Sequence, residues 1–255
     1  MESKAKPGTA LVTGGAVRLG RAIALGLAEM GYDIALHYNA SENSALSTRN
    51  EIQALGRSCD LYRCNLAEEQ CASLIDSVFQ AHPSLSLLVN SASAYAGATI
   101  RETTSEIFDQ QMNLNLKAPF FLARQFANRL TAGNIINIID NKVQFNQYHY
   151  AAYLLSKKML AELTKLQALE FAPSIRVNGV APGVVLPASS RSEQYINWRI
   201  DAIPVKRKGE AEHIVSACRY ILENDFVTGQ ILFVDGGEGL TSVGRNAESY
   251  GESNR

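Results

Sequence analysis

Short apolar runs alternate with segments of helical spacing along almost the whole chain of 255 residues. The apolar runs have the length and composition of strands, and the segments between them place apolar residues three and four positions apart. Strands that alternate with helices in this way lie parallel and are joined by right-handed crossovers. The chain is therefore predicted to form one α/β domain over residues 1–255, a doubly wound sheet of seven parallel strands with helices on both faces.

Two stretches fall outside this alternation. Residues 184–208 form the longest stretch without a clear period and follow a strand end, where a substrate lid would sit; an ordinary surface loop is the alternative. Residues 238–255 are rich in Gly, Ser, Glu and Asn and are predicted to be a partly mobile tail. Strands are expected at 9–12, 33–38, 58–64, 85–90, 134–139, 176–181 and 231–234, and helices near 19–30, 44–55, 67–80, 105–130, 150–171 and 211–222.

Composition excludes several classes of function. A formal net charge of −1 gives no basic field for nucleic acid, and the run Lys206-Arg207-Lys208 is interpreted as a solvated loop. The four cysteines have no paired metal spacing, so no metal site is predicted. The chain starts without a signal-like apolar segment, and no apolar run approaches the roughly 20 residues that span a bilayer. These features predict a cytoplasmic protein without a nucleic-acid or membrane partner.

A glycine-rich turn follows the first predicted strand: Thr13-Gly14-Gly15-Ala16-Val17-Arg18-Leu19-Gly20. The glycines permit a tight turn and close approach of a pyrophosphate, which the free N–H groups of the next helix would hold. Gly14, Arg18, Leu19 and Gly20 are therefore assigned to a dinucleotide cofactor, with a plain tight turn as the alternative. Arg18 stands where many such turns carry glycine, and its planar cation favours a phosphate-rich cofactor or an anionic or acceptor-rich substrate over a plain surface position.

The ends of the second and third predicted strands indicate which dinucleotide binds. The sequence there is His37-Tyr38-Asn39-Ala40-Ser41, without an acid that would accept from an adenosine 2′-hydroxyl and without a basic residue. The missing carboxylate predicts NADPH. Asn39 and Ser41 would donate to its 2′-phosphate, and His37 and Tyr38 would line the adenosine. Asn65 and Leu66 would hold the adenine, although Asn65 also fits an ordinary strand-end turn.

Tyr153 and Lys157 are separated by four positions in a predicted helix, so their side chains lie on one face. A free phenol titrates at about 10, and a neighbouring ammonium favours the phenolate. Lys157 is therefore expected to lower the pKa of Tyr153 toward neutrality, where a phenol can hand over a proton. The pair predicts a catalytic acid.

Three further segments are expected at the same edge of the sheet, because the carboxyl ends of parallel strands meet there. These segments are Asn90-Ser91-Ala92-Ser93-Ala94-Tyr95 after the fourth strand, Asp140 after the fifth, and Pro182-Gly183-Val184 after the sixth. A nicotinamide would lie among them. Asn115 lies in the helix before the fifth strand and joins the same set.

Together these motifs, with Val234-Asp235-Gly236-Gly237 near the end, resemble the short-chain dehydrogenase/reductase family across nearly all 255 residues. The resemblance implies a Rossmann-type fold and a reductase that transfers hydride from a nicotinamide cofactor. It implies that Tyr153 protonates the reduced centre and that Lys157 holds the nicotinamide ribose and depresses the pKa of Tyr153. It also implies that Asn115 supports a water leading protons in from solvent, and it suggests a homotetramer.

Three departures from the common family pattern narrow the resemblance to its pteridine reductase and dihydromonapterin reductase branch. These are Asp140 in place of the usual serine, Arg18 in the glycine turn, and Asn90-Ser91-Ala92-Ser93 where Asn-Asn-Ala-Gly is common. A serine polarises a ketone, whereas a carboxyl group accepts from ring N–H groups or, protonated, relays a proton to a ring nitrogen. In that branch Tyr95 would stack the pterin against the nicotinamide, and Ser93 would bond a cofactor phosphate or the pterin amino group. A loop aromatic packed on the lid is the alternative for Tyr95.

The sequence therefore predicts an NADPH-dependent reductase of a dihydropterin, of the dihydromonapterin, dihydrobiopterin or dihydrofolate type. Arg18, Ser93, Tyr95, Asp140 and Tyr153 are assigned to the substrate. Two alternatives stay open: a ketoreductase of 3-oxoacyl thioesters or small carbonyls, and a non-catalytic NADP-binding sensor.

Overall fold

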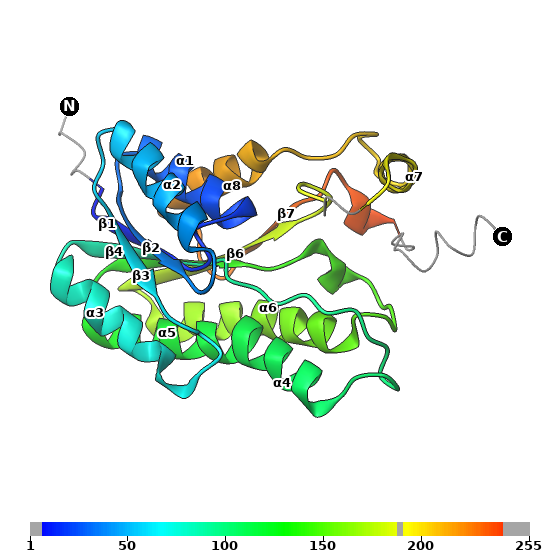
Figure 1. The fold of residues 1–255 in the computed structure, drawn as a ribbon, viewed down its shortest axis with the longest axis horizontal. Helices are drawn as coiled ribbons and strands as arrows, with labels where there is room; N and C mark the ends of the chain where they lie inside the picture. The colour runs from blue at the N-terminus through cyan, green and yellow to red at the C-terminus, as the bar shows by residue number, and fades with distance from the viewer. Residues whose placement is uncertain (1–6, 188–190, 242–255) are drawn as a thin grey trace.

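The computed structural model describes residues 7–187 and 191–241 as a sheet of seven strands with helices on both faces (Figure 1). Its strands are β1 (Thr9–Val12), β2 (Asp33–Tyr38), β3 (Cys59–Arg63), β4 (Leu85–Asn90), β5 (Gly133–Ile138), β6 (Ile175–Pro182) and β7 (Ile231–Val234). Its α-helices are α1 (Arg18–Glu29), α2 (Glu42–Ala54), α3 (Ser73–Ala81), α4 (Ser105–Met112), α5 (Ala118–Arg129), α6 (Ala151–Phe171), α7 (Glu193–Asp201) and α8 (Ala211–Glu223). Shorter helical segments are η1 (Glu69–Ala72), η2 (Asn113–Lys117), η3 (Asn141–Gln144) and η4 (Glu238–Leu240).

The strand order is β3-β2-β1-β4-β5-β6-β7, and every neighbouring pair is parallel. Helices α1, α2 and α8 cover one face, while α3, α4, α5 and α6 lie on the other (Figure 1). The predicted fold class is confirmed. The chain reverses its direction across the sheet between β1 and β4, and at such a switch point the adjoining loops diverge to leave a crevice over the strand carboxyl ends.

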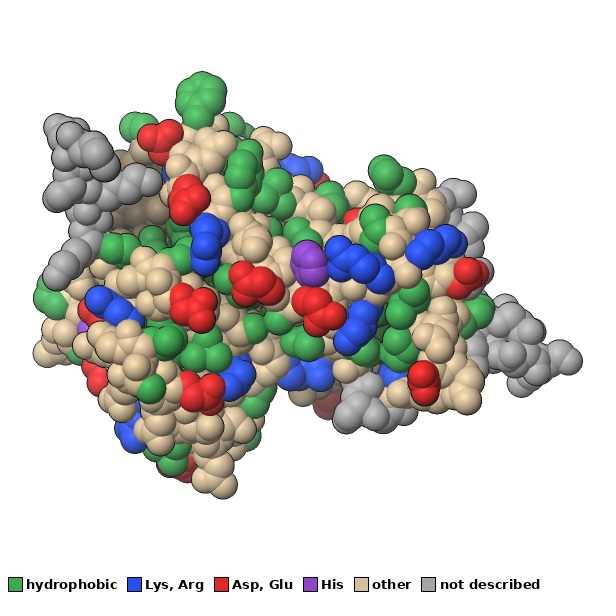
Figure 2. Space-filling model, turned by 90° about the horizontal axis from the view of Figure 1, so that it is seen from above, with side chains coloured by type: hydrophobic (Ala, Val, Ile, Leu, Met, Phe, Trp, Pro, Cys, Tyr) green, Lys and Arg blue, Asp and Glu red, His purple; other side chains and the backbone are tan. Residues whose placement is uncertain are grey.

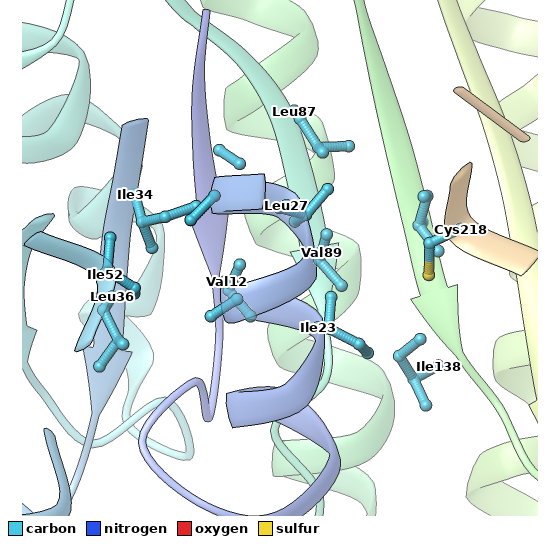
Figure 3. Packing of buried hydrophobic residues seen from close by; sticks show 14 of the residues in the cluster. Val12, Ile23, Leu27, Ile34, Leu36, Ile52, Leu87, Val89, Ile138 and Cys218 are labelled. Atoms are coloured by element: carbon cyan, nitrogen blue, oxygen red, sulfur yellow. The ribbon is translucent and has the colours of Figure 1, made fainter. Parts of the chain in front are cut away.

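Successive strand residues face opposite helical layers, so both sheet faces are apolar and the strands are buried on both sides. Val12 and Val89 pack toward α1, whereas their chain neighbours Leu11 and Leu88 belong to the cluster under α5. Ile23 and Leu27 of α1 lie over β1 and β4 (Figure 3), with 1% and 0% of their surfaces exposed. This packing fixes α1, and therefore the turn that precedes it, above the switch point.

Some elements differ from the sequence prediction. The helix expected at 105–130 is divided into α4, the π-helical segment η2 and α5. The stretch 184–208 contains helix α7, which the sequence prediction did not include. The tail expected from Glu238 begins with the turn η4, in which Glu238 is 1% exposed; residues 242–255 lie outside the described part of the chain.

Acidic and basic side chains are interspersed over the face seen in Figure 2 and do not gather into a basic stripe. Within residues 7–187 and 191–241, no helix is long and apolar enough to cross a membrane. The described residues also contain no cluster of His, Cys, Asp and Glu side chains that could hold a metal ion.

Candidate active site

Two adjoining cavities lie over the carboxyl ends of the strands. The first, of about 450 Å³, runs along the turn after β1 and is called here the glycine-turn cavity. The second, of about 470 Å³, is lined by Tyr95, Tyr153 and Tyr195 and is called the tyrosine cavity. Both are lined by Arg18, Ser93, Asp140, Tyr153, Gly183, Val185 and Leu186. The two cavities therefore adjoin, with Tyr153 in the wall of both.

The turn before α1 brings backbone close to the first cavity. Gly14 has a φ of +63°, and a β-carbon at Gly20 would lie 2.1 Å from the Gly14 carbonyl oxygen, so other side chains cannot be accommodated there. Arg18, Leu19 and Gly20, the first residues of α1, line this cavity, and the free N–H groups at a helix start are the kind that bind phosphate. Arg18 has a φ of +51°, in the left-handed region that favours glycine. Arg18 is therefore strained for a non-glycine residue, and it lines both cavities.

His37 ties this turn to the neighbouring strands. Its Nδ1 accepts a hydrogen bond from the Gly14 N–H at 3.1 Å, so the proton belongs on Nε2, which lies 3.0 Å from the Cys64 carbonyl oxygen. Burial lowers the pKa of His37, the bond to Cys64 opposing this in part, and so favours the neutral ring that this pattern needs. His37 lines the cavity and also fixes its wall.

The loop after β4 is held from two sides. Thr13 Oγ1 accepts from the backbone N–H groups of Ser91 and Ala92 at 2.9 and 3.1 Å, which fixes the loop to the glycine turn. Asn115, fully buried in the π-helical segment, accepts from Ala94 N–H at 2.8 Å and donates to the Ala94 carbonyl at 3.0 Å. π-helical turns often occur at functional sites because the extra residue redirects a side chain.

Asn115 also bonds Ser93 and Ser156, at 3.1 Å each. It therefore joins the loop after β4 to α6, the helix that carries Tyr153. The predicted water relay through Asn115 stays a prediction.

Asp140, Tyr153 and Lys157 meet at the junction of the two cavities. Tyr153 Oη donates to Asp140 Oδ2 at 2.6 Å, and Asp140 Oδ1 accepts from the Lys142 N–H at 2.8 Å. Lys157 Nζ donates to the Ile138 carbonyl oxygen at 2.8 Å and lies 5.9 Å from the centroid of the Tyr153 ring. The end of β5 and one face of α6 thus assemble a phenol, a carboxylate and an ammonium.

The pKa values of this group correct one prediction. Burial raises the pKa of Tyr153 well above its ordinary value, and the charge and hydrogen bond of Asp140 raise it further. The expected lowering by Lys157 was therefore wrong, because the carboxylate is the nearer partner and the ammonium is held by a backbone carbonyl. Burial lowers the pKa of Lys157 to about 8, against an opposing effect of Asp140. Tyr153 keeps its proton and donates a hydrogen bond to Asp140.

Aromatic rings form one wall of the tyrosine cavity. Tyr95 stacks on Tyr150, with ring centroids 4.4 Å apart and an angle of 14°, and meets Tyr153 edge-on at 4.6 Å. Half of the Tyr95 surface is exposed although one ring face is covered. Offset stacks of this kind provide a flat apolar platform for a planar ligand.

The segment after β6 contributes to the walls of both cavities and is held in place by two contacts. The Arg18 guanidinium donates to the Leu186 carbonyl oxygen, which links the glycine turn to this segment. In α7, Arg199 forms a 2.7 Å ion pair with Glu238 of η4, and both side chains are buried. The stretch 184–208, predicted to be a lid, therefore lines both cavities at its start, and its helix α7 is tied to η4 by this ion pair. Whether it moves stays a prediction.

Comparison with known proteins agrees with this geometry. A family model described as enoyl-(acyl carrier protein) reductase matches residues 15–238, which is most of the chain. The chain belongs to the short-chain dehydrogenase/reductase family. Among relatives of this short-chain reductase, the 3-oxoacyl-(acyl-carrier-protein) reductase FabG of Staphylococcus epidermidis is 30% identical over 238 residues. That match covers 90% of this chain and 98% of the relative.

Two similar solved structures are FolM alternative dihydrofolate reductase 1 from Brucella canis and from Brucella suis, each in complex with NADP. They match the short-chain reductase with TM-scores of 0.86 and 0.85 and 31% sequence identity. Both matches cover 92% of this chain, and 95% and 96% of the two structures. The predicted family, its likeness to a pterin reductase branch and the enzyme class, a nicotinamide-dependent reductase, are confirmed.

The structure places most of the predicted site residues of the short-chain reductase at these two cavities. Val184 and Tyr95 line the tyrosine cavity. The glycine-turn cavity is lined by Gly14, Arg18, Leu19, Gly20, His37, Asn39, Asn65, Leu66, Ser91, Ala92, Ser93, Asp140, Tyr153, Lys157, Pro182 and Gly183.

Three predicted cofactor residues lie elsewhere. Asn90 is buried and its side chain donates to Asn137 Oδ1 of the neighbouring strand β5 at 2.8 Å. Tyr38 is buried in the core cluster with α1. Ser41 is exposed at the start of α2 and does not line either cavity. Strand alternation explains Asn90 and Tyr38, because the last strand residue can face a helix layer instead of the crevice.

Several lining residues were not predicted. Val17, Leu114, Ile138, Ile139, Val185 and Leu186 are apolar and carried no chemical signal. Lys142, Arg191, Tyr195 and Arg199 line the tyrosine cavity. Lys142 could have been found, because it lies two positions after Asp140. Residues 191–199 could not, because the sequence did not show that the stretch contains a helix.

Proposed function

We propose that this short-chain reductase reduces a dihydropterin with NADPH. The observation that carries the proposal is the 2.6 Å hydrogen bond between Tyr153 Oη and Asp140 Oδ2 at the junction of the two cavities. A carboxylate at this place serves a substrate that has ring nitrogens to protonate, whereas a ketone needs only a hydroxyl donor. The likeness to NADP complexes of two alternative dihydrofolate reductases supports both the substrate and the cofactor.

The residues of the glycine-turn cavity fit a dinucleotide. The side-chain-free approach at Gly14 and Gly20 suits a pyrophosphate, and Asn39 and Asn65 lie where β2 and β3 end, near a bound adenosine. The loop after β2 has no basic residue for a 2′-phosphate. The register of the sheet, however, pairs Tyr38 with Arg63, whose exposed side chain lies 4.0 Å from Glu42 in a loose ion pair. We assign Arg63 to the 2′-phosphate.

Proton transfer in the proposed reaction involves Tyr153 and Asp140. Bound NADPH supplies the hydride, which adds to the carbon of the pterin C=N bond. Tyr153 Oη gives its proton to the adjacent nitrogen, and Asp140, in hydrogen-bond contact with the phenol, returns a proton taken from solvent. Lys157, whose ammonium donates to the Ile138 carbonyl oxygen, holds the nicotinamide ribose. The tyrosine cavity accepts the pterin ring against Tyr95.

NADPH oxidation in the presence of dihydrobiopterin, dihydromonapterin and dihydrofolate tests the proposal. We expect turnover of at least one dihydropterin, and a loss of about a hundred-fold or more in kcat for Tyr153→Phe, which removes only the acidic proton. NADPH binding by the same variant, measured by fluorescence, is the control. Turnover of a 3-oxoacyl thioester without turnover of any pterin would refute the proposal.

The second candidate function is reduction of a 3-oxoacyl thioester or a small carbonyl. The 30% identity with a FabG reductase favours it, since that relative covers 90% of this chain. Asp140 opposes it. Asp140→Ser discriminates the two: improved carbonyl reduction with lost pterin reduction supports a pterin reductase, and unchanged pterin reduction contradicts the role given to Asp140.

We also propose a homotetramer in the cytoplasm. Helices α5 and α6 expose Phe120, Leu155, Met159, Leu166 and Leu169, an apolar surface of the kind that subunit interfaces bury. The four cysteines are free thiols, as is usual in a reducing compartment.

A further inference from the structure

The tyrosine cavity has more positive charge than its single lining carboxylate can balance. Arg18, Lys142, Arg191 and Arg199 line it, against Asp140. Arg199 is neutralised by Glu238, and the two oxygens of Asp140 bond Tyr153 and the Lys142 N–H. Among the residues that the structure describes, neither Lys142 nor Arg191 forms an ion pair with an acid.

Both cations are half-buried and rest against aromatic rings. Lys142 Nζ lies 5.5 Å from the Tyr95 ring centroid and 5.2 Å from that of Tyr150, and it donates to Tyr95 Oη at 3.1 Å. Arg191 lies over the Tyr195 ring, with Cζ 4.9 Å from its centroid. Cation–π contacts offset only part of the cost of removing such charges from water.

Tyr150 brings the two cations together. Lys142 stands over its ring, and Arg191 donates to its Oη at 3.4 Å. Tyr150 itself has a φ of +59°, a conformation that non-glycine residues seldom adopt, and its ring is stacked on Tyr95. The wall on which a flat ring would lie therefore has a pair of cations, without acidic partners, beside it.

We propose that Lys142 and Arg191 bind an anionic group carried by the side chain of the pterin substrate. This inference rests on the proposed function and names the substrate class within it: a dihydropterin whose substituent ends in a carboxylate or a phosphate. Lysine and arginine form charge-assisted hydrogen bonds with either anion. A glutamate-bearing dihydrofolate supplies the carboxylate, and a phosphorylated dihydropterin supplies the phosphate. Neutral dihydrobiopterin and dihydromonapterin lack both.

Steady-state kinetics with these three kinds of pterin tests the inference on the intact enzyme. For the wild type we expect an anionic pterin to have the lowest KM, rising with ionic strength, while the KM of a neutral pterin is insensitive to salt. Lys142→Gln and Arg191→Gln should each raise the ratio of the anionic to the neutral KM by about ten-fold, the usual worth of a charge-assisted bond. The KM values for dihydrofolate and for the phosphorylated pterin show whether the site prefers a carboxylate or a phosphate.

Lys165→Gln is the matched control, because Lys165 is an exposed α6 cation paired with Glu162 and away from both cavities. It should leave the KM ratio and its salt dependence unchanged. Equal KM values for charged and neutral pterins, insensitive to salt and to both substitutions, would overturn the inference while leaving the pterin reductase intact. Absence of turnover with every pterin would overturn the proposed function and this inference with it.

Discussion

Arg18 carries its side chain at the cost of backbone strain. Its φ of +51° is one that glycine adopts freely and that costs other residues about 1 kcal/mol or more. Arg18→Gly should therefore be more stable to unfolding than Arg18→Ala by about 1 kcal/mol, while both lose the guanidinium. Thermal or urea unfolding of the two variants measures the difference, and an NADPH titration should show equally weakened binding. Equal unfolding free energies would mean that the backbone is not strained there.

The Lys157 ammonium should give NADPH binding a pH dependence. Burial lowers the pKa of this lysine to about 8, so the charge is present below that pH and is lost as the pH rises through it. Binding should weaken in the same range, whereas Tyr153, whose pKa is raised, stays protonated. Fluorescence titrations with NADPH below and above pH 8 measure this change in affinity.

The variant Asp140→Asn tests whether Lys157 causes this loss of NADPH binding at high pH. The Asp140 carboxylate raises the pKa of Lys157, so its removal should lower that pKa further. NADPH binding should then begin to weaken at a lower pH. The same substitution should lower the pKa of Tyr153. If the pH at which NADPH binding weakens is unchanged in this variant, Lys157 is not the group responsible.

Arg63 is the residue to test for cofactor choice. The sheet register places it beside Tyr38 at the ends of β3 and β2, and its partner Glu42 is 4.0 Å away. Arg63→Gln should raise the Kd for NADPH by about ten-fold and leave that for NADH unchanged, because only NADPH has the 2′-phosphate. Arg57→Gln, two residues before the start of β3, serves as the control. A similar loss for both nucleotides would assign Arg63 a structural role.

At the scale of elements, the ion pair between Arg199 and Glu238 decides where α7 lies. Both side chains are almost fully buried, and Asn141 Nδ2 also donates to Glu238 at 2.9 Å. Removing one partner leaves an uncompensated buried charge, so Glu238→Gln should lower the free energy of unfolding by about 3 kcal/mol. Denaturant unfolding measures the loss, and the double variant Arg199→Met with Glu238→Met should recover most of it. No recovery would show that packing, not charge, positions α7.

The sequence could predict the repeated elements but not their interruptions. Alternating apolar periods gave the strands and helices because each element buries one regular face. The π-helical segment around Asn115 has no such signature, since one extra residue per turn depends on contacts with Ser93, Ala94 and Ser156. For the same reason the positions of α7 and η4 follow from a tertiary ion pair and could not be read from a local pattern.

At the scale of the whole molecule, the site was predictable as far as the parallel sheet determines it. Residues that follow the strand ends reach the crevice by topology alone, and Asn39, Asn65 and Ser93 accordingly line the glycine-turn cavity. The direction in which the pKa of Tyr153 is shifted could not be predicted from the sequence. The sequence showed Lys157 four positions from the phenol, whereas the fold decided that the carboxylate lies closer.

The proposed tetramer is expected to form through the exposed apolar surface of α5 and α6. Leu166, 63% exposed, and its neighbour Leu169 would lie in a subunit interface. Leu166→Glu should therefore reduce the mass in solution, because it places a charge in an apolar contact. Light scattering coupled to size exclusion measures this, with Leu55→Glu at the end of α2 as the control. A wild-type monomer would refute the tetramer.

The burial of Glu238 sets a limit on shortening this protein from its C-terminal end. A truncated form that stops before Glu238 would leave the buried Arg199 guanidinium without its counter-ion, and α7 would lose its anchor. A form that extends through Thr241 keeps the pair and the turn that presents it. Shortened forms and C-terminal fusions of this enzyme should accordingly retain Glu238 and the η4 turn.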